Sequence, residues 1–529
     1  MKPRLSIVLP SGVLLALAGC AEPPPPATAP SASPPGVDAP AGAGAASITA
    51  RDMYTRIAFL ASDALRGRDT PSPGLDSAAA YLVREYQRLG LEPAGENGSF
   101  YQHYPLGLFG LDTATVHFGT VDGAGQDNRM LAYGADFLAL PGSLPSAGAE
   151  MRHGRLLYLG RLGEGELPGR EYRGELPVVT LPGMPDRAWF QQLTRLRRAA
   201  AAAGATALVV AADSQFPAPA FQQFAAQMRR PQRGYTAPTE IPVFVLSERA
   251  WRTVAQRAAA TPTQLATAGA TPLPLAGIAA HFAADFRAHE QSRAPNVAAV
   301  LRGSDPALRG EYVVLSAHLD HVGVGRPVNG DSIYNGADDD ASGTSALVEV
   351  AEALASLPAA QRPRRSVIFL HVSGEEKGLL GSRWYTDHPT VPIRQSVANL
   401  NLDMIGRNAP DSVVVIGKAY SSLGQVIDAV GRRHPELGLT VADDLWPEER
   451  FFFRSDHFNF ARKEIPALFF FTGVHADYHR PSDEVEKIDA DKAARIARLV
   501  FYTVQEIGNA PTRPTWDPRG LEEVRGMTR

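Results

Sequence analysis

Histidine, aspartate and glutamate side chains follow a series of hydrophobic segments in the C-terminal half of this 529-residue chain. Segments 312–317, 367–372, 397–402 and 467–471 have the composition of buried β-strands. Ligand sites in open α/β sheets lie beyond the carboxyl ends of the strands. Five candidate donors lie near such strand ends or directly before a helix: His318, Asp339, Glu376, Asp403 and His479.

The five candidate donors are more informative together than singly. A lone histidine after a strand is commonly structural, a glutamate pair in a loop is commonly solvated, and three aspartates in a row commonly precede a helix. Carboxylates that converge on one edge of a sheet repel one another and shift one another's pKa values. Two divalent cations would remove that conflict, and carboxylate and imidazole ligands suit zinc, with cobalt or manganese as substitutes.

Helical patterns fill the gaps between the strands. They cover 342–357, 421–434 and 490–507, and a further helix is expected at 76–89. Ser342 is expected to help start the first of these helices. Strands that alternate with helices predict a layered α/β domain with a largely parallel central sheet.

Five strings in this region carry a family resemblance. HLDHVGVGRPVNGDSIYNGADDDASG begins at His318, and SGEEKGLLGS, NLDMIG, RSDHFNF and YHRPSDEVEKID follow it in that order. Together they resemble metallopeptidase family twenty-eight, which includes bacterial leucyl aminopeptidase, aminopeptidase Y, glutamate carboxypeptidase and the related glutaminyl cyclases. The resemblance spans residues 290–508 and 50–110. It implies the zinc exopeptidase fold, a three-layer sandwich with a largely parallel, mixed central sheet.

The resemblance also implies a division of roles among the candidate donors. One zinc ion would be bound by His318, Asp339 and Asp403. The other would be bound by Asp339, Glu376 and His479, so that Asp339 bridges the two ions. Glu375 would not be a ligand; it would take a proton from the attacking water and pass it to the leaving amine.

Further residues are implied to support this site. Asp320 would orient the imidazole of His318, Asp340 would follow Asp339 through a cis peptide bond, and Ser455 and Asp456 match a loop beside the second metal without a defined role. A side-chain donor to the oxyanion is also expected, but the sequence does not place one.

The activity that the resemblance favours is removal of N-terminal residues from peptides. A glutamate carboxypeptidase-like enzyme is the alternative, with Arg326 or Arg407 as possible partners of a terminal carboxylate. A glutaminyl cyclase-like transferase would need one zinc ion. A receptor or adhesion ectodomain would have lost the ligands, which are all present here.

Residues 118–284 have a different sequence pattern from the rest of the chain. GRLLYLG from Gly154, RAAAAAGATALVVAAD from Arg198 and IPVFVLSE from Ile241 resemble a protease-associated domain, a small β-rich module inserted in several peptidases. The catalytic domain is therefore expected to comprise residues 48–117 and 285–510, with 511–529 as a C-terminal tail.

The N-terminus is expected to direct export. Lys2 and Arg4 precede an apolar run that is too short to span a bilayer, and Leu17-Ala18-Gly19-Cys20 resembles the lipobox of bacterial lipoproteins. Residues 1–20 are thus expected to be a signal peptide, Cys20 a lipidated residue, and the Pro- and Ala-rich segment 21–47 a disordered tether. The expected location is the cell envelope, with secretion as the alternative.

Composition narrows the remaining classes of function. Apolar residues make up 44% of the chain and charged residues 20%, which is ordinary for a globular protein. The formal net charge is -4 and no run of lysine and arginine occurs, so a nucleic-acid partner is not expected. The expected partners are peptide substrates, with membrane contact only through the lipid. Cys20 is the only cysteine, which excludes an internal disulfide.

Overall fold

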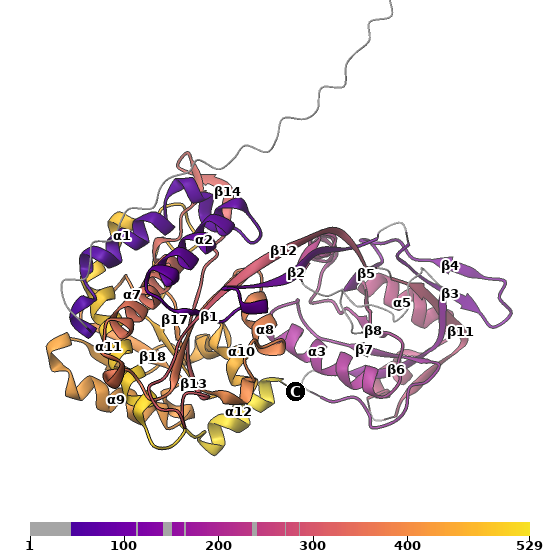
Figure 1. Cartoon of the computed structure of the whole chain (residues 1–529). Helices are drawn as coiled ribbons and strands as arrows, with labels where there is room; N and C mark the ends of the chain where they lie inside the picture. Colours follow the sequence, from indigo (N-terminus) through magenta and orange to yellow (C-terminus); the bar gives the residue numbers. More distant parts are fainter. Residues whose placement is uncertain are drawn as a thin grey trace, which may run out of the picture.

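The chain folds into two parts that are joined by a long two-stranded ribbon (Figure 1). A computed structural model describes residues 44–112, 115–140, 151–162, 165–234, 241–269, 271–284 and 286–528. The predicted signal peptide, Cys20 and most of the predicted tether lie outside the described residues. The first part contains the candidate site, and the second is inserted between two strands of the first.

A ten-stranded mixed sheet forms the centre of the first part, in the order β19-β18-β20-β17-β13-β16-β12-β2-β9, with β1 paired to β12. Strands β20, β17, β13 and β16 are mutually parallel, which confirms the predicted largely parallel centre. Their bounds, and those of the other strands, are β1 Glu92–Pro93, β2 Tyr101–Leu111, β9 Gln232–Gly234, β12 Phe286–Leu301, β13 Tyr312–His318, β16 Ser366–Val372, β17 Ser396–Leu402, β18 Ser412–Ile416, β19 Thr440–Ala442 and β20 Ala467–Phe471.

Helices cover both faces of this sheet, which gives the predicted three layers. One face packs against five helices through a continuous apolar core; they are α1 Ala50–Leu60, α2 Pro73–Arg88, α7 Gly343–Ala355, α9 Leu423–Arg433 and α11 Ala490–Asn509. The other face packs against α8 Leu380–Asp387 and α10 His457–Ala461, through Tyr385 and Phe460. The parallel strands are buried along their whole length because both faces are covered.

The second part is built on an eight-stranded sheet in the order β4-β3-β11-β6-β7-β8-β10-β5. Its strands are β3 His117–Asp122, β4 Asn128–Met130, β5 Phe137–Leu140, β6 Arg152–Arg161, β7 Glu175–Thr180, β8 Leu208–Ala211, β10 Val243–Leu246 and β11 Leu273–Ala283. Its helices are α3 Arg187–Ala202, α4 Ala218–Met228, α5 Glu248–Arg257 and α6 Pro262–Thr267. Separate apolar clusters lie on the two faces of this sheet, so the insert has a core of its own.

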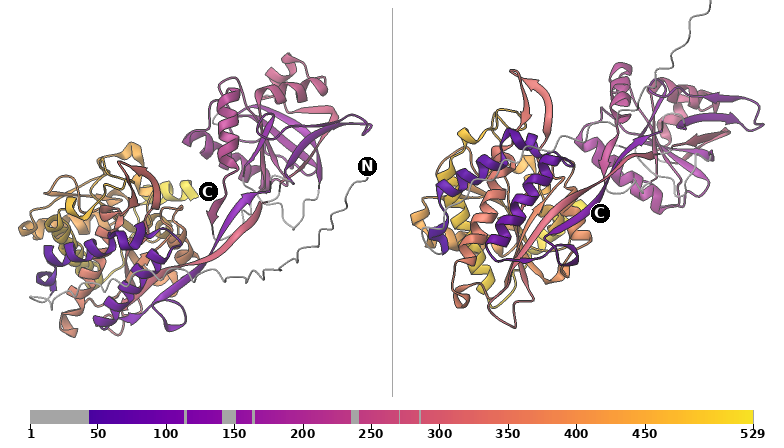
Figure 2. Two further views of the ribbon diagram at one scale, coloured as in Figure 1. Left: turned by 90° about the horizontal axis from the view of Figure 1, so that it is seen from above. Right: turned by 45° about the horizontal axis from the view of Figure 1, so that its top comes forward.

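Strands β2 and β12 pair antiparallel from the ten-stranded sheet out to the insert, and they form the ribbon seen in both views of Figure 2. The eight-stranded sheet begins at His117 and ends at Ala283, beside the expected limits of 118 and 284. Within 118–284, β9 is the exception, because it pairs with β2 and so extends the ten-stranded sheet.

Three expectations about the chain differ from the structure. The predicted C-terminal tail contains a helix, α12 Pro518–Thr528, whose Val524 is buried. The predicted tether ends earlier than expected, because Gly44–Ser47 form a short 3-10 helix and the Gly44 N–H donates to Ser356. Ser342 occupies the N-cap position of α7, but its side chain makes no capping hydrogen bond; the Asp340 carboxylate instead accepts the N–H of Gly343 at 2.9 Å.

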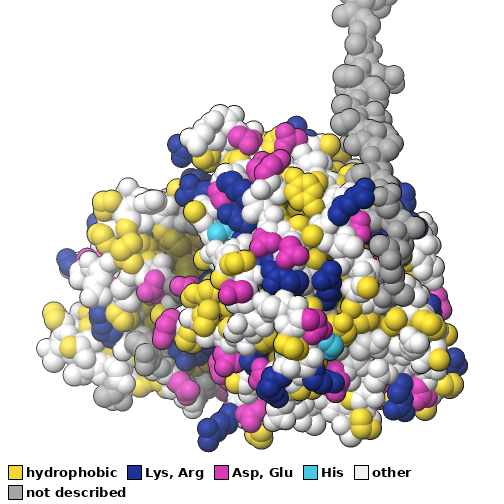
Figure 3. All heavy atoms as spheres, turned by 90° about the vertical axis from the view of Figure 1, so that its left-hand side faces the viewer, with side chains coloured by type: hydrophobic (Ala, Val, Ile, Leu, Met, Phe, Trp, Pro, Cys, Tyr) yellow, Lys and Arg dark blue, Asp and Glu magenta, His cyan; other side chains and the backbone are white. Residues whose placement is uncertain are grey.

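Figure 3 shows the face that lies at the left in Figure 1. Acidic and basic side chains alternate over it, so their fields largely cancel at a distance. In the part of the chain that the structure describes, no helix is both long and apolar enough to cross a membrane.

Candidate metal centre

The carboxyl ends of three neighbouring parallel strands position most of the candidate donors. His318 is the last residue of β13, Asp403 directly follows β17, and Glu375 and Glu376 lie in the loop after β16. Because these strands run in the same direction side by side, their ends meet at one edge. Loops before α7 and after β20 bring Asp339 and His479 to the same edge.

Two groups of potential ligand atoms form there, and Asp339 belongs to both. In the first group, Nε2 of His318 lies 3.1 Å from Oδ1 of Asp339 and 3.5 Å from Oδ1 of Asp403. In the second, Nε2 of His479 lies 3.1 Å from Oδ2 of Asp339 and 3.1 Å from Oε2 of Glu376. Each oxygen of Asp339 thus faces a different group, as a bridging carboxylate does between two ions.

His321 also belongs to the second group, although the sequence did not single it out. Its Nδ1 lies 2.8 Å from Oε1 of Glu376 and 3.7 Å from Oδ2 of Asp339. The sequence places His321 three residues after His318, in HLDH. That spacing does not show where the loop after β13 turns, so it could not identify His321 as a ligand candidate.

The two groups fit divalent cations. Nε2 of His479, Oε1 of Glu376 and Oδ1 of Asp403 are buried without a hydrogen-bond partner. Buried polar atoms are rarely left unpaired, since each costs free energy. The donors are imidazole nitrogens and carboxylate oxygens, the set that zinc prefers, and all lie within 4.8 Å of the other donor atoms of their group.

The pKa values of the site show how strongly its carboxylates and imidazoles interact. Burial lowers the pKa of His479, but Asp339 and Glu376 outweigh it and raise that pKa to about 10. Burial and Asp339 raise the pKa of Glu376, but His321 and His479 outweigh them and lower it to about 2. Without metal, protons on the imidazoles therefore neutralise the carboxylates, and bound cations would take over that role.

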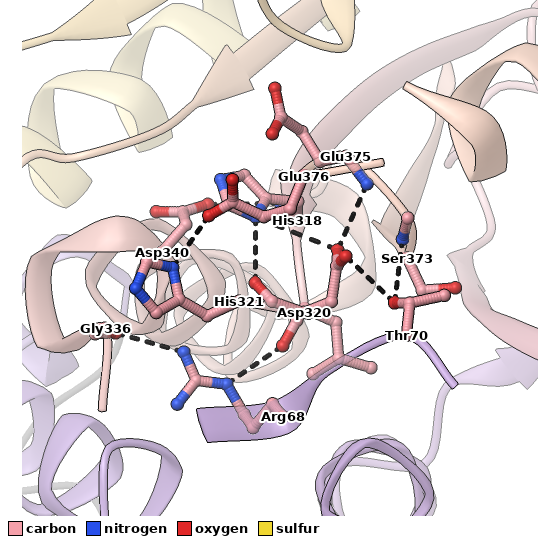
Figure 4. Close-up of polar contacts among 12 residues, drawn as sticks. Arg68, Thr70, His318, Asp320, His321, Gly336, Asp340, Ser373, Glu375 and Glu376 are labelled. Atoms are coloured by element: carbon pink, nitrogen blue, oxygen red, sulfur yellow. Dashed lines mark hydrogen bonds and ion pairs between the residues drawn. The ribbon is translucent and has the colours of Figure 1, made fainter. Parts of the chain in front are cut away.

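Asp320 supports His318 in a different way from the one expected. The imidazole Nδ1 is 3.0 Å from the backbone oxygen of Asp320, whereas the carboxylate is 3.9 Å away (Figure 4). A carbonyl only accepts hydrogen bonds, so Nδ1 carries the proton and Nε2 is left free to bind metal. The carboxylate of Asp320 instead accepts hydrogen bonds from the Thr70 hydroxyl and the Glu375 N–H.

The loop that carries Asp339 is held from several directions. Asp340 accepts hydrogen bonds from the backbone N–H groups of His318 and Met404, and the expected cis peptide bond joins Asp339 to Asp340. The Asp483 carboxylate accepts the N–H of Asp339 at 3.2 Å. Gly336 has a φ of 61°, and a Cβ atom there would lie 2.5 Å from the His321 ring, so only glycine fits.

Ser455 acquires a defined contact. Its hydroxyl donates to Oδ2 of Asp403 at 2.9 Å and accepts a hydrogen bond from the Asn401 amide. That leaves Oδ1 of Asp403 for a metal ion. The neighbouring Asp456 is fully buried, and burial raises its pKa to about 7.

A pocket opens over the first group of ligands. Its walls combine polar residues of the site with an apolar surface, and it is lined by His318, Asp339, Glu375, Asp403, Met404, Phe451, Arg454, Ser455, Phe469, Phe471, Val474 and Tyr478. Tyr478 was not singled out from the sequence, although it directly precedes His479. Burial and the nearby carboxylates raise its pKa, so its hydroxyl stays protonated and able to donate.

A mixed α/β sheet that gathers two groups of metal ligands, a glutamate and a pocket at one edge is the arrangement of a metallohydrolase. The family model described as Peptidase family M28 matches residues 296–504, a stretch that contains Glu375 and all the ligand candidates. This part of the chain is therefore similar to peptidase family M28.

The chain is also similar to individual proteins. Aminopeptidase YwaD of Bacillus subtilis is 28% identical over 214 residues, which cover 39% of this chain and 43% of the relative. A probable leucine aminopeptidase of Arthroderma benhamiae is 27% identical, over 41% of this chain and 58% of the relative. The chain spans about half the length of these relatives. The solved aminopeptidase from Aneurinibacillus sp. strain AM-1 is 18% identical, covers 89% of this chain and 96% of its own, and gives a TM-score of 0.46.

Proposed function

We propose that this protein is a zinc-dependent aminopeptidase that removes N-terminal residues from peptides with two zinc ions per chain. The observation that carries the proposal is the shared Asp339, whose two oxygens face different groups of ligands beside Glu375. Cobalt or manganese would fit the same donors. Two complete groups favour a peptidase over a one-zinc cyclase, and intact ligands favour an enzyme over a binding module.

The residues of the pocket divide the work of hydrolysis. Two zinc ions held here would acidify a water molecule and polarise the scissile carbonyl. The carboxylate of Glu375 would accept the proton of that water and deliver it to the leaving amine. Burial and nearby carboxylates raise the pKa of Glu375 well above its usual value, which favours proton uptake. The Tyr478 hydroxyl would donate to the developing oxyanion.

The surroundings of the arginines favour cleavage from the N-terminus. Arg407 already forms an ion pair with Asp477 at 2.9 Å. Arg326 is exposed on the hairpin formed by β14 Gly323–Val328 and β15 Asp331–Tyr334. Arg454 lines the pocket, but its guanidinium lies 3.2 Å from Glu449 and packs on the Phe451 ring. The carboxypeptidase alternative depends on Arg454 leaving Glu449 for a substrate carboxylate.

A peptide panel separates the two directions of attack. Each sequence would be made with a free or acetylated N-terminus and with a free or amidated C-terminus. The aminopeptidase requires the free N-terminus and tolerates the amide; the opposite dependence would establish the carboxypeptidase. Chelator treatment should abolish the activity, and two equivalents of zinc should restore it.

We further propose that the protein is exported and attached to the cell envelope through a lipid on Cys20, and that residues 118–284 are a protease-associated domain. The support for the first proposal is the apolar run and lipobox-like ending of the N-terminus. Replacing Cys20 by Ala should move the protein from the membrane fraction to the soluble fraction. A protein that stays in the membrane fraction after this change would refute the lipid anchor.

A further inference from the structure

His321 lies against the second group of ligands and is completely buried. Its Nδ1 is 2.8 Å from Oε1 of Glu376 (Figure 4). Its ring meets the ring of His479 edge-on, at 5.6 Å between centroids. The nitrogen therefore points into the space between Glu376 and Asp339, where an ion bound by the second group would lie.

The short contact between His321 and Glu376 does not have the geometry of a hydrogen bond. Both ring nitrogens of His321 and Oε1 of Glu376 are buried without a hydrogen-bond partner, because distance and direction are not satisfied together. Nε2 of His479 has the same property, although two carboxylates lie 3.1 Å from it. Close approach without alignment is what two ligands of one cation show.

An imidazole that is buried with unpaired ring nitrogens carries a free-energy penalty, because those nitrogens have lost their hydrogen bonds to water without gaining a partner. A cation between His321, His479 and the two carboxylates would remove the penalty for Nδ1. Burial without a partner does not by itself identify a ligand, because His457 is equally buried and both of its ring nitrogens are also unpaired. What distinguishes His321 is that its Nδ1 lies 2.8 Å from Oε1 of Glu376 and 3.7 Å from Oδ2 of Asp339.

We propose that His321 is a fourth protein ligand of the ion held by Asp339, Glu376 and His479. The second site then offers four donors, two of them imidazoles, against three donors with one imidazole in the first site. An additional nitrogen donor strengthens zinc binding, so the second site fills first. This inference rests on the two-metal centre of the proposed function, but not on the direction of peptide cleavage.

Unequal sites give the two ions unequal roles. His318, Asp339 and Asp403 line the pocket together with Glu375, whereas His321, Glu376 and His479 are not among the residues that line it. The three-donor ion thus faces the substrate with open coordination positions, as a catalytic zinc requires, and the four-donor ion is the more closed site.

The number of histidine nitrogens around zinc tests this directly in the unaltered protein. The metal-free chain would be loaded with one equivalent of zinc and studied by X-ray absorption. The expected result is two imidazoles per zinc, because the ion occupies the site of His321 and His479. One imidazole per zinc, or an even distribution over both sites, would overturn the proposal.

Replacing His321 by Asn provides the second test. The amide of Asn sits near the place of Nδ1 and can still donate to Glu376, but it is a poor zinc ligand. We expect at least a tenfold loss of affinity in the tighter site and one imidazole per bound zinc. If His321→Asn keeps the tight site, His321 only orients Glu376 and the proposal is wrong.

His475→Asn is the matched control. His475 is also buried and contacts a carboxylate, Asp338, at 3.3 Å, but it is not part of either group of ligands. This variant should bind zinc as the unaltered protein does. The peptide panel is an independent measurement, so a chain that binds zinc through two imidazoles yet cleaves no peptide would refute the proposed function and leave this inference standing.

Discussion

The backbone N–H of Glu375 donates a hydrogen bond of 3.2 Å to the carboxylate of Asp320. The other oxygen of that carboxylate accepts from the Thr70 hydroxyl at 2.9 Å, and Thr70 in turn accepts the N–H of Gly374 at 3.0 Å. Two segments that are distant in the sequence, those of Thr70 and Asp320, thus fix the loop after β16 (Figure 4). They hold it through its backbone, which leaves the Glu375 side chain free to face the pocket and the next residue, Glu376, free to bind metal.

The first prediction concerns this division between Glu375 and Glu376. Replacing Glu375 by Gln keeps the shape of the side chain but removes the proton acceptor, so kcat should fall roughly 10²–10⁴-fold. Zinc content should stay at the level of the unaltered protein, because Glu375 is not a ligand. Glu486→Gln, at an exposed position of the same domain, is the control. Turnover within a few-fold of normal, or a loss of zinc, would contradict the assigned role.

The second prediction concerns Tyr478 as the oxyanion donor. Its ring stacks on His479 at 3.9 Å, and Tyr478→Phe keeps the stack while removing the hydroxyl. One oxyanion donor is worth roughly 10²–10³-fold in kcat, whereas KM and zinc content should change little. Tyr502 stacks on His434 at 3.5 Å, so Tyr502→Phe is a matched control. If both variants have the same kcat, Tyr478 is only a packing residue.

The third prediction concerns acid stability and uses His371, whose Nε2 is 2.5 Å from the Tyr86 hydroxyl. Burial lowers the pKa of His371 to about 3 in the folded chain, against about 6.5 when unfolded. Between these values the unfolded chain binds the extra proton, so this contribution to stability is present above pH 6.5 and decreases as the pH falls. By pH 5 the stability lost in this way is about 2 kcal/mol.

His371→Gln tests this value because the Gln amide can still reach Tyr86 but does not titrate. Unfolding free energies of the metal-free proteins would be measured by urea at pH 7 and at pH 5. The variant should lose less stability than the unaltered protein on acidification, by about 2 kcal/mol. Equal losses would show that His371 does not carry the effect.

The central features of the site could be predicted because they follow from strand ends. His318 and Asp403 lie at or directly after the ends of buried strands, Glu376 lies in the loop after another, and parallel strands end at one edge of a sheet. The role of Asp320 could not be predicted, because the choice between its carbonyl and its carboxylate depends on the turn of a loop. His321 was missed for the same reason. Its partner Glu376 is far away in the sequence, and only the fold brings the two together.

The C-terminus was misjudged on different grounds. Residues 511–529 were expected to be a tail, and they contain few apolar side chains. A short helix needs only one or two buried contacts when a surface already exists to receive it, and such a surface is not visible in a local pattern. Here Trp516 Nε1 donates to the backbone oxygen of Glu464 at 2.7 Å, and Val524 enters an apolar cluster.

The last prediction follows from the composition of that cluster. Val524 packs in it with Met404, Phe451, Phe469 and Phe471, which also line the pocket. Val524→Ala should therefore lower the stability of the catalytic domain by about 2 kcal/mol. It should also raise KM for peptides with large apolar N-terminal residues, because the rings behind the pocket wall can shift. Glu522→Ala, on the exposed face of the same helix, should change neither quantity. If the two variants behave alike in urea unfolding and in KM, then α12 is a surface appendage that does not support the pocket.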